Sequence, residues 1–261
     1  MTGSILVARD GVVATVSLSN PGKLNALRAA MWRELTRVMI ELSALEDLRC
    51  IVLRGAGRKA FAAGADIAEF ARVRANVGQG KHYHRELVNG PLKVVGECRH
   101  ATVAMIHGPC VGGGLEIACQ CDLRISGESG RFGVPINRLG FAIAYDELSA
   151  LLALAGRAVA LEILVEGRVW NAREALAKGL LTRVVPDDGL EQEIYATAQR
   201  NAEGAPLAAR RHKKFIRRLT PPPEPLTPQQ SEENFAYFNT EDYRIGYDAF
   251  IHKKKPKFVG R

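Results

Sequence analysis

Two short apolar segments, each followed by a glycine-containing loop and a helical pattern, constrain the fold of this chain most. The first segment is 50–53 (CIVL), and glycines at 55, 57 and 64 separate it from the helical pattern ADIAEFARV. The second is 101–106 (ATVAMI), which leads through three consecutive glycines at 112–114 into the pattern LEIACQ. Short apolar runs bounded by glycine favour buried strands, and strands alternating with helices are typical of an α/β protein. We therefore predict an α/β fold.

The rest of the chain continues this alternation and then becomes helical. A strand pattern at 12–18 precedes an amphipathic helical pattern at 27–45, in which apolar residues recur every three or four positions. The later predicted elements are helices at 148–154, 159–167 and 171–181, a strand at 182–185, a turn at 186–189, a basic helical segment at 190–219, a proline-rich break at 221–228 and a helix from 231. We expect residues 1–190 to form a core and residues 191–261 a separate helical region.

Composition excludes several classes of protein. The 261 residues are 47% hydrophobic and 25% charged, which is enough for a sizeable core in a globular domain. The five cysteines have no framework spacing, and Cys119 and Cys121 lack the partners of a zinc site, so we interpret all of them as buried thiols. The start MTGSILVARD shows no signal peptide and we find no apolar stretch of 18 residues, so we expect a cytoplasmic protein outside the membrane.

The net charge of +8 indicates an anionic partner without identifying it. Nucleic acid, an anionic membrane and an anionic small molecule all remain open on charge alone. Basic residues gather at 210–218 (RRHKKFIRR) and in the tail at 253–257. Because the chain contains no RNA-binding motif, we rank nucleic-acid binding as the last of these alternatives.

The two glycine loops are candidates for binding an oxyanion. The first residues of a helix have backbone N–H groups without intrahelical partners, and glycine allows a ligand to approach them closely. Two such N–H groups aimed at one point would form an oxyanion hole. The second loop lacks the glycine spacing of a dinucleotide-binding motif, Pro109 occupies the place of its tight turn, and no Gly-Lys-Ser/Thr sequence is present.

Several segments in the same order closely resemble the enoyl-CoA hydratase/isomerase (crotonase) superfamily. They are LSNPGKLNAL at 18–27, KAFAAGADIAEF at 59–70, GPCVGGGLEIACQCDLRI at 108–125, FGVP at 132–135, EALAKGLLTRVVP at 174–186 and TEDYRIGYDAFIHKKKPKFVGR at 240–261. The resemblance implies a spiral core of repeated ββα turns over 1–190. It also implies that the helical region at 191–261 joins subunits into homotrimers, which often stack as hexamers.

The same resemblance implies the roles of individual residues. Ala65 and Gly113 would donate their N–H groups to the thioester oxygen of an acyl-CoA, and Glu116 would be a catalytic carboxyl group. Coenzyme A would be bound by Lys23, Leu24, Lys59, Ala63, Asp66, Ile67, Phe250 and Lys253. Ala68 departs from the lysine or arginine often found after Asp-Ile. The resemblance implies no metal and no cofactor, since coenzyme A is part of the substrate.

One departure leaves the exact reaction open. Family hydratases carry a second glutamate directly after the Phe-Gly-x-Pro motif, and here Ile136 takes that place. Tyr145 or Asp146 are the candidates to supply the missing group, although Asp146 is also a good helix cap. His82 and His84, in a predicted helix that could cover the acyl pocket, are candidate bases as well, whereas His107 fits a structural role better.

The resulting expectation is an enzyme that stabilises the enolate of an acyl-CoA thioester, with hydration of a 2-enoyl-CoA as the first hypothesis. The first alternative is another reaction of the same family: isomerisation, decarboxylation, dehalogenation or C–C cleavage. The second is a protein that binds coenzyme A esters with little catalysis.

Overall fold

The chain winds around a six-stranded sheet in the computed structural model, which describes residues 3–220, 227–233 and 235–260. The strand order is β1-β2-β3-β4-β6-β9, with β1 and β2 paired as an antiparallel hairpin and the other strands parallel. These strands are β1 Ser4–Asp10, β2 Val13–Ser19, β3 Cys50–Gly55, β4 Ala101–Ile106, β6 Leu123–Gly127 and β9 Arg183–Val185. A second, three-stranded sheet of order β5-β7-β8 is formed by β5 Pro109–Val111, β7 Arg131–Gly133 and β8 Val169–Asn171. The α/β prediction is confirmed.

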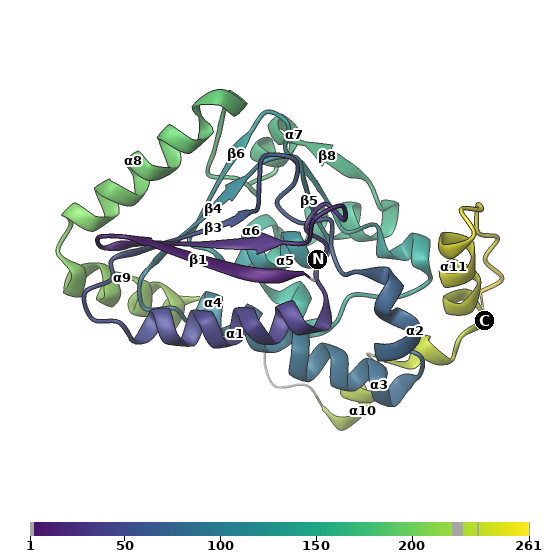
Figure 1. Ribbon diagram of the computed structural model, residues 1–261. Helices are drawn as coiled ribbons and strands as arrows, with labels where there is room; N and C mark the ends of the chain where they lie inside the picture. The colour runs from purple at the N-terminus through teal and green to yellow at the C-terminus, as the bar shows by residue number, and fades with distance from the viewer. Residues whose placement is uncertain (1–2, 221–226, 234, 261) are drawn as a thin grey trace.

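Helices cover both faces of the large sheet, with α1 below it and α8 above it in the view of Figure 1. The α-helices are α1 Ala29–Ala44, α2 Phe70–Val73, α3 Val77–His82, α4 Asn89–Gly96, α5 Gly113–Gln120, α6 Tyr145–Leu161, α7 Ala172–Ala177, α8 Leu190–Glu203, α9 Pro206–Leu219, α10 Pro228–Glu233 and α11 Glu241–Ile251. Two π-helices, Tyr83–Val88 and Glu162–Glu166, continue α3 and α6. Short 3-10 helices span Ile67–Glu69, Pro135–Leu139, Asp187–Gly189 and Ala236–Asn239.

Burial on two faces explains the uninterrupted apolar run of β3. Ile51 and Leu53 pack into the main core, whereas Cys50 and Val52 point to the opposite face and pack with α8. Successive side chains of a strand alternate between faces, so a strand covered on both sides is apolar throughout. The boundary expected at residue 190 stays a prediction, and α8, which follows it directly, packs on the large sheet.

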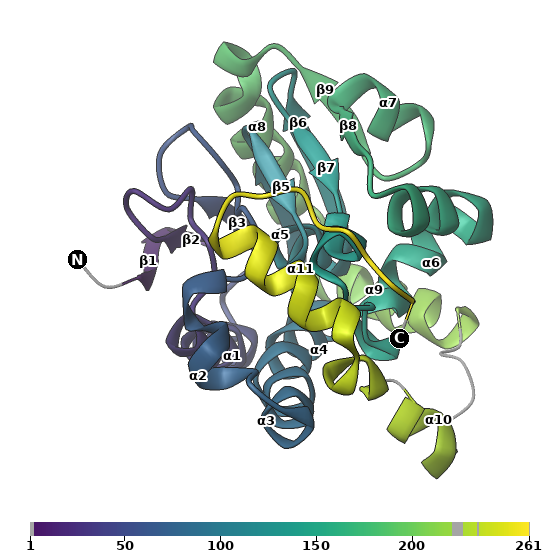
Figure 2. The same cartoon turned by 90° about the vertical axis from the view of Figure 1, so that its right-hand side faces the viewer.

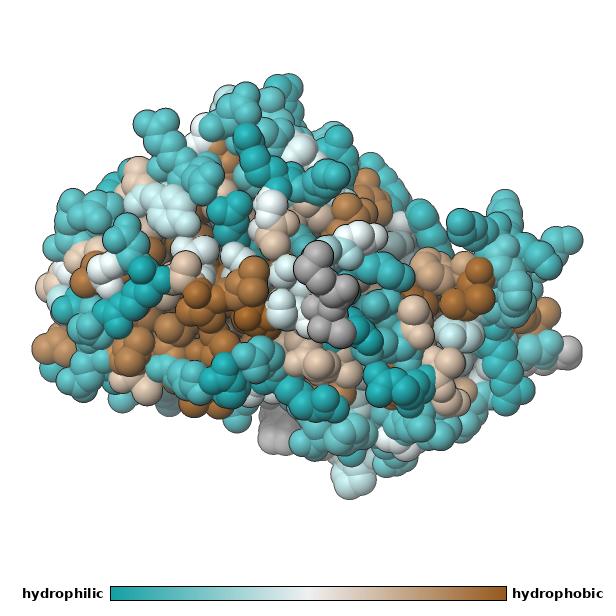
Figure 3. All heavy atoms as spheres, in the orientation of Figure 1, coloured by the Kyte–Doolittle hydropathy of each residue, from teal (hydrophilic) through white to brown (hydrophobic). Residues whose placement is uncertain are grey.

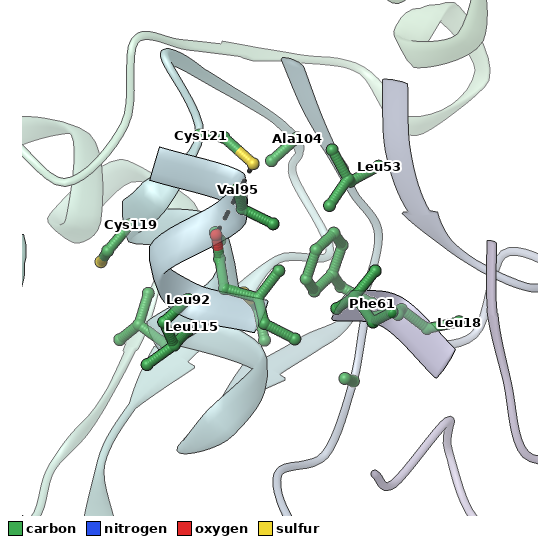
Figure 4. Packing of buried hydrophobic residues seen from close by; sticks show 14 of the residues in the cluster. Leu18, Leu53, Phe61, Leu92, Val95, Ala104, Leu115, Cys119 and Cys121 are labelled. Atoms are coloured by element: carbon green, nitrogen blue, oxygen red, sulfur yellow. Dashed lines mark hydrogen bonds between the residues drawn. The ribbon is translucent and has the colours of Figure 1, made fainter. Parts of the chain in front are cut away.

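Helix α5 lies within the main core. Figure 4 shows Leu115 and Cys119 on this helix and Phe61 and Leu53 close by, with the Cys121 thiol bonded to the carbonyl of Ile117. All five cysteines are free and buried, which confirms their interpretation as buried thiols. The start of α5 is therefore held rigidly by the packing of its remaining turns.

The expectation that no apolar stretch reaches 18 residues is wrong. The helix from Tyr145 to Glu166, formed by α6 and the following π-helix, is long and apolar enough to cross a membrane by length and composition, and 17% of an apolar 18-residue window within it is buried. Length and composition alone are weak evidence for a membrane span. Gly156 interrupts the helical geometry of α6 (φ 76°, ψ 173°), and its first turn contributes to the cavity described below.

The C-terminal segment returns to the core across the front of the molecule. Figure 2 shows α11 lying in front of β5 and α5, although these elements are far from α11 in the sequence. Phe235, Phe238 and Tyr243 form a small buried aromatic cluster with Ala144, which directly precedes α6. This return places aromatic side chains next to the start of α6.

Candidate active site

The first glycine loop is fixed against the segment that leads into α1. The N–H of Leu27 donates to the carbonyl of Gly64 at 2.7 Å, and the N–H of Asp66 donates to the carbonyl of Leu27 at 2.8 Å. This parallel bridge uses the residues on both sides of Ala65. The N–H of Ala65 therefore points away from Leu27, and Ala65 lines a cavity.

The second loop meets the first at the beginning of α5. Gly112 has a positive φ of 50°, and Gly113 is the first helical residue, so the N–H of Gly113 has no intrahelical partner. A Cβ built on Gly64 would lie 3.2 Å from the carbonyl oxygen of Val111 and 3.9 Å from the nitrogen of Gly113. The two N–H groups predicted to form the oxyanion hole are thus brought together.

A cavity of about 430 Å³ opens beside these loops. Six residues predicted to act in catalysis or binding lie on its wall: Ala63, Ala65, Ile67, Gly113, Glu116 and Phe250. Ile136 lines the cavity too, so the position where family hydratases carry the second glutamate is part of the apolar wall. Aromatic side chains from Trp32, Phe70, Tyr83 and Phe141 complete much of the lining.

The other predicted coenzyme A residues lie outside this lining. Lys23 and Leu24 sit beside Ala63, whose N–H donates to the carbonyl of Leu24 at 3.0 Å. The carboxylate of Asp66 accepts from the N–H of Ala68 and caps a short 3-10 helix. Lys59 and Lys253 are exposed on the surface. Their roles in binding stay predictions.

Glu116 is a partly buried carboxyl group in the wall of the cavity, in surroundings that favour its protonated form. Burial raises its pKa well above the usual range, and the negative charge of Glu147 raises the pKa further. The cation of Arg74 lowers it by less than these two effects. A carboxyl group that keeps its proton at neutral pH can donate that proton in a reaction.

The second carboxyl group in the cavity is Glu147, which the sequence analysis did not select. Tyr145 is 43% exposed, and Asp146 is exposed and accepts from the Asn89 side chain at 3.1 Å, so neither lines the cavity. Glu147 is 5% exposed and lies one turn before the buried Leu151 on the inner face of α6. The spacing of four residues from an apolar core position is the sequence signal that could have identified it.

Glu147 is an anion despite its burial. Burial alone would raise its pKa, but the contact and hydrogen bond with His84, the cation of Arg74 and the N–H of Ala144 hold this pKa below its usual range. His84 is neutral, because burial lowers the pKa of its ring more than Glu147 raises it. The pKa values of the two carboxyl groups of the cavity are therefore shifted in opposite directions, which suits one to act as an acid and the other as a base.

Of the histidine candidates, His82 is exposed and lies outside the lining of the cavity. Both ring nitrogens of His84 contact protein groups, Nδ1 with Glu147 and Nε2 with Arg74, so neither is free to take a proton from a substrate. His107 is buried, with Nε2 3.4 Å from the carbonyl oxygen of Asp187, in line with its expected structural role. Among the residues that the structure describes, no group of three or more His, Cys, Asp or Glu side chains could hold a metal ion.

Comparison with known proteins identifies the family. The sequence profile of the enoyl-CoA hydratase/isomerase family matches residues 8–261. The chain belongs to this family. Its relatives include a probable enoyl-CoA hydratase of Mycobacterium bovis, 35% identical over 99% of this chain and 98% of the relative. A short-chain-enoyl-CoA hydratase of Clostridium acetobutylicum is 30% identical over 97% of this chain and 96% of the relative.

Solved structures of the family share the architecture. An enoyl-CoA hydratase/carnithine racemase from Magnetospirillum magneticum is 48% identical, with a TM-score of 0.82 over 98% of this chain and 96% of that structure. A methylmalonyl-CoA decarboxylase in complex with 2-nitronate-propionyl-CoA is 27% identical, with a TM-score of 0.89 over the whole of both chains. The crotonase-type fold with a helical C-terminal region is thereby confirmed.

Proposed function

We propose that this enoyl-CoA hydratase/isomerase family enzyme adds water to the double bond of a 2-enoyl-CoA. The observation that supports the proposal is the pair of carboxyl groups, Glu116 and Glu147, which line a single cavity beside two glycine loops and whose pKa values are shifted in opposite directions. Relatives named enoyl-CoA hydratase over nearly their whole length support the same reaction.

Each group has a defined task in the proposed reaction. The N–H groups of Ala65 and Gly113 hold the thioester oxygen and stabilise the negative charge that it gains as the enolate forms. Glu147 takes a proton from water, whose oxygen bonds to the β-carbon. Glu116 donates its proton to the α-carbon as the enolate collapses. Glu147 thus provides the function that Ile136 cannot provide, and no metal or redox cofactor enters the proposed chemistry.

Hydration of crotonyl-CoA tests this proposal directly. The loss of ultraviolet absorbance of the conjugated thioester would be followed for the wild-type protein and for Glu116→Gln and Glu147→Gln. Loss of a general acid or base lowers the rate by roughly 10²- to 10⁴-fold, so both variants should lose most of their kcat.

Asp146→Asn is the matched control, because it changes the neighbouring carboxylate, which faces away from the cavity. It should keep the wild-type rate. Full activity of Glu147→Gln, or loss of activity in Asp146→Asn alone, would contradict the assignment of Glu147 as the second catalytic group.

Allylic isomerisation is the second candidate, favoured by the apolar wall at Ile136. An isomerase moves a proton between two carbons and needs no bound water, so the same two carboxyl groups would suffice. A 3-enoyl-CoA substrate separates the two reactions, because isomerisation produces the absorbing conjugated thioester, whereas an enzyme that only hydrates 2-enoyl-CoA leaves this unconjugated substrate unchanged.

We also propose that the protein assembles as a homotrimer or hexamer in the cytoplasm. Three basic residues of helix α9 contact the rest of the chain: Arg210 donates to the carbonyl of Glu46, Lys213 to Asp122 and the carbonyl of His100, and Arg217 to the carbonyl of Gly96. Its large apolar side chains are instead exposed: Leu207, Phe215, Ile216 and Leu219. Figure 3 shows further hydrophobic side chains near β1 and α1, where Leu6 and Ile40 are exposed. Exposed apolar surface of this extent supports contact with further copies of the chain.

A further inference from the structure

Arg74 is a buried cation that the proposed chemistry does not use. It is 2% exposed and lines the cavity, and no carboxylate lies within ion-pair distance of it among the described residues. Four aromatic rings surround its guanidinium, with centroids 4.3 Å (Phe70), 4.7 Å (Phe141), 5.0 Å (Tyr83) and 5.7 Å (Phe238) away. Cation–π attraction offsets part of the cost of burying this charge, but it does not explain why a cation is placed there.

The hydrogen bonds of Arg74 fix the proton of His84. The Nη2 of Arg74 donates to the Nε2 of His84 at 2.7 Å. A guanidinium has no acceptor and keeps its protons in proteins, so Nε2 must be the unprotonated nitrogen of the ring. The ring proton therefore sits on Nδ1, which donates to the carboxylate of Glu147. The hydroxyl of Tyr237 lies 3.4 Å from Nε2 and is also a donor to it.

We propose that Arg74 and His84 are positioning residues, which hold Glu147 as an oriented anion through a directed chain of hydrogen bonds. This inference rests on the proposed function of Glu147 and assigns a task to two further residues. Since Nε2 is occupied by a permanent donor, His84 stays neutral and cannot remove the proton of water itself. The chain of hydrogen bonds ends at Glu147, whose negative charge is balanced by the positive charge of Arg74.

The charges around Glu147 come from four parts of the chain. The groups that face it are Glu116 on α5, His84 and Tyr83 on the π-helix Tyr83–Val88, Arg74 after α2, and Tyr237 in the C-terminal segment. Arg74 is the cation of this set, and burial favours the neutral forms of Glu116 and the tyrosines. Without Arg74, one of the groups that lower the pKa of Glu147 would be lost, and burial would favour its protonation more strongly.

Replacement of Arg74 tests the proposal through the pH profile. Activity in the free enzyme requires ionised Glu147, so the acid limb of kcat/KM for crotonyl-CoA reports its pKa. In Arg74→Gln the acid limb should move to higher pH by about one unit or more, with a loss of kcat and little change in KM. Arg72→Gln is the control, because Arg72 is exposed and pairs with Glu69, and it should keep the wild-type profile.

Replacement of His84 separates orientation from simple packing. In His84→Asn the amide nitrogen stands near the position of Nδ1 and can still donate to Glu147, whereas His84→Leu fills space without a donor. The asparagine variant should keep at least ten times the kcat of the leucine variant. The comparison of the two His84 variants still tests the proposal if Arg74→Gln does not fold. Equal losses in both His84 variants, or an unmoved acid limb in folded Arg74→Gln, would overturn the proposal.

A direct titration of Glu147 distinguishes a failure of the positioning proposal from a failure of the proposed hydration reaction. If the wild-type protein does not hydrate crotonyl-CoA, ¹³C NMR of glutamate-labelled protein, assigned with Glu147→Gln, still reports the ionisation of Glu147. A raised titration midpoint in Arg74→Gln would support the positioning role although hydration had failed. An unchanged midpoint would refute the positioning role by itself.

Discussion

Glu116 is a residue whose protonation should be visible in stability as well as in catalysis. Its pKa is raised in the folded protein by burial and by Glu147, so the folded state keeps a proton that the unfolded chain loses above about pH 4.5. The folded state then binds more protons, and stability falls as pH rises, by up to about 1.4 kcal/mol per pH unit. This loss continues until the pH reaches the raised pKa.

Glu116→Gln should therefore become more stable relative to wild type as pH rises from 5 to 8. Glutamine is neutral at every pH and resembles the protonated carboxyl group. The free energy of unfolding of this variant therefore lacks the pH-dependent loss that a protonated Glu116 causes. Thermal unfolding of both proteins in a series of buffers measures the difference in Tm. Asp188→Asn, at an exposed carboxylate, should show a constant difference. A constant difference for Glu116→Gln would contradict a protonated Glu116.

Sequence reasoning identified the backbone part of this site better than its side chains. The resemblance to the family implies Ala65, Gly113 and Glu116, and the structure places all three in the lining of the cavity. Glu147 was missed in favour of Tyr145 and Asp146, because the direction of a side chain depends on which face of α6 is buried. Arg74 could not be selected from the sequence, since the rings and the histidine that surround it come from distant segments.

At the scale of elements, the C-terminal segment holds the wall of the cavity through the contact of Gly80 with Phe238. A Cβ built on Gly80 of α3 would lie 2.1 Å from a ring carbon of Phe238, far inside van der Waals contact. Phe238 in turn packs against Tyr243, and its ring lies 5.7 Å from the guanidinium of Arg74. A side chain at position 80 would push this aromatic group outward.

Gly80→Ala should destabilise the protein by about 1–3 kcal/mol, the usual cost of overpacking, and should lower activity because Arg74 loses part of its ring cage. Gly78→Ala is a close control, since its Cβ would meet its nearest atom, Oδ1 of Asn76, at an ordinary 3.4 Å. Urea unfolding and crotonyl-CoA kinetics measure the two effects. Equal behaviour of the two variants would show that Phe238 can move away without consequence.

The larger elements were predictable where periodicity was strong. The predicted strands at 12–18, 50–53 and 101–106 correspond to β2, β3 and β4, and the helix at 27–45 corresponds to α1. The edge strand β1 was missed because nearly all of its side chains are exposed or charged, so no buried pattern marks it. The helical segment at 190–219 is two helices, α8 and α9, since the chain leaves helical geometry at Gly204 and Ala205.

At the scale of the whole molecule, α9 leaves large apolar side chains in solvent. Arg210 and Lys213 bind the core, whereas Phe215 is 56% and Leu219 is 82% exposed. Burying a large apolar side chain between subunits would contribute about 1.5–3 kcal/mol to their association, whereas a charged side chain at the same place would first have to lose its water. The apolar face of α9 is therefore a place where subunits can join.

A double variant, Phe215→Glu with Leu219→Glu, should convert the assembled protein into monomers. Light scattering during size-exclusion chromatography measures the mass, and Lys214→Glu on the same helix is the control that adds negative charge without removing apolar surface. An unchanged mass in the double variant would place the subunit interface elsewhere. Because Phe250 lines the cavity of its own chain, the monomer should still bind crotonyl-CoA, so a loss of binding together with assembly would mean that a neighbouring subunit completes the site.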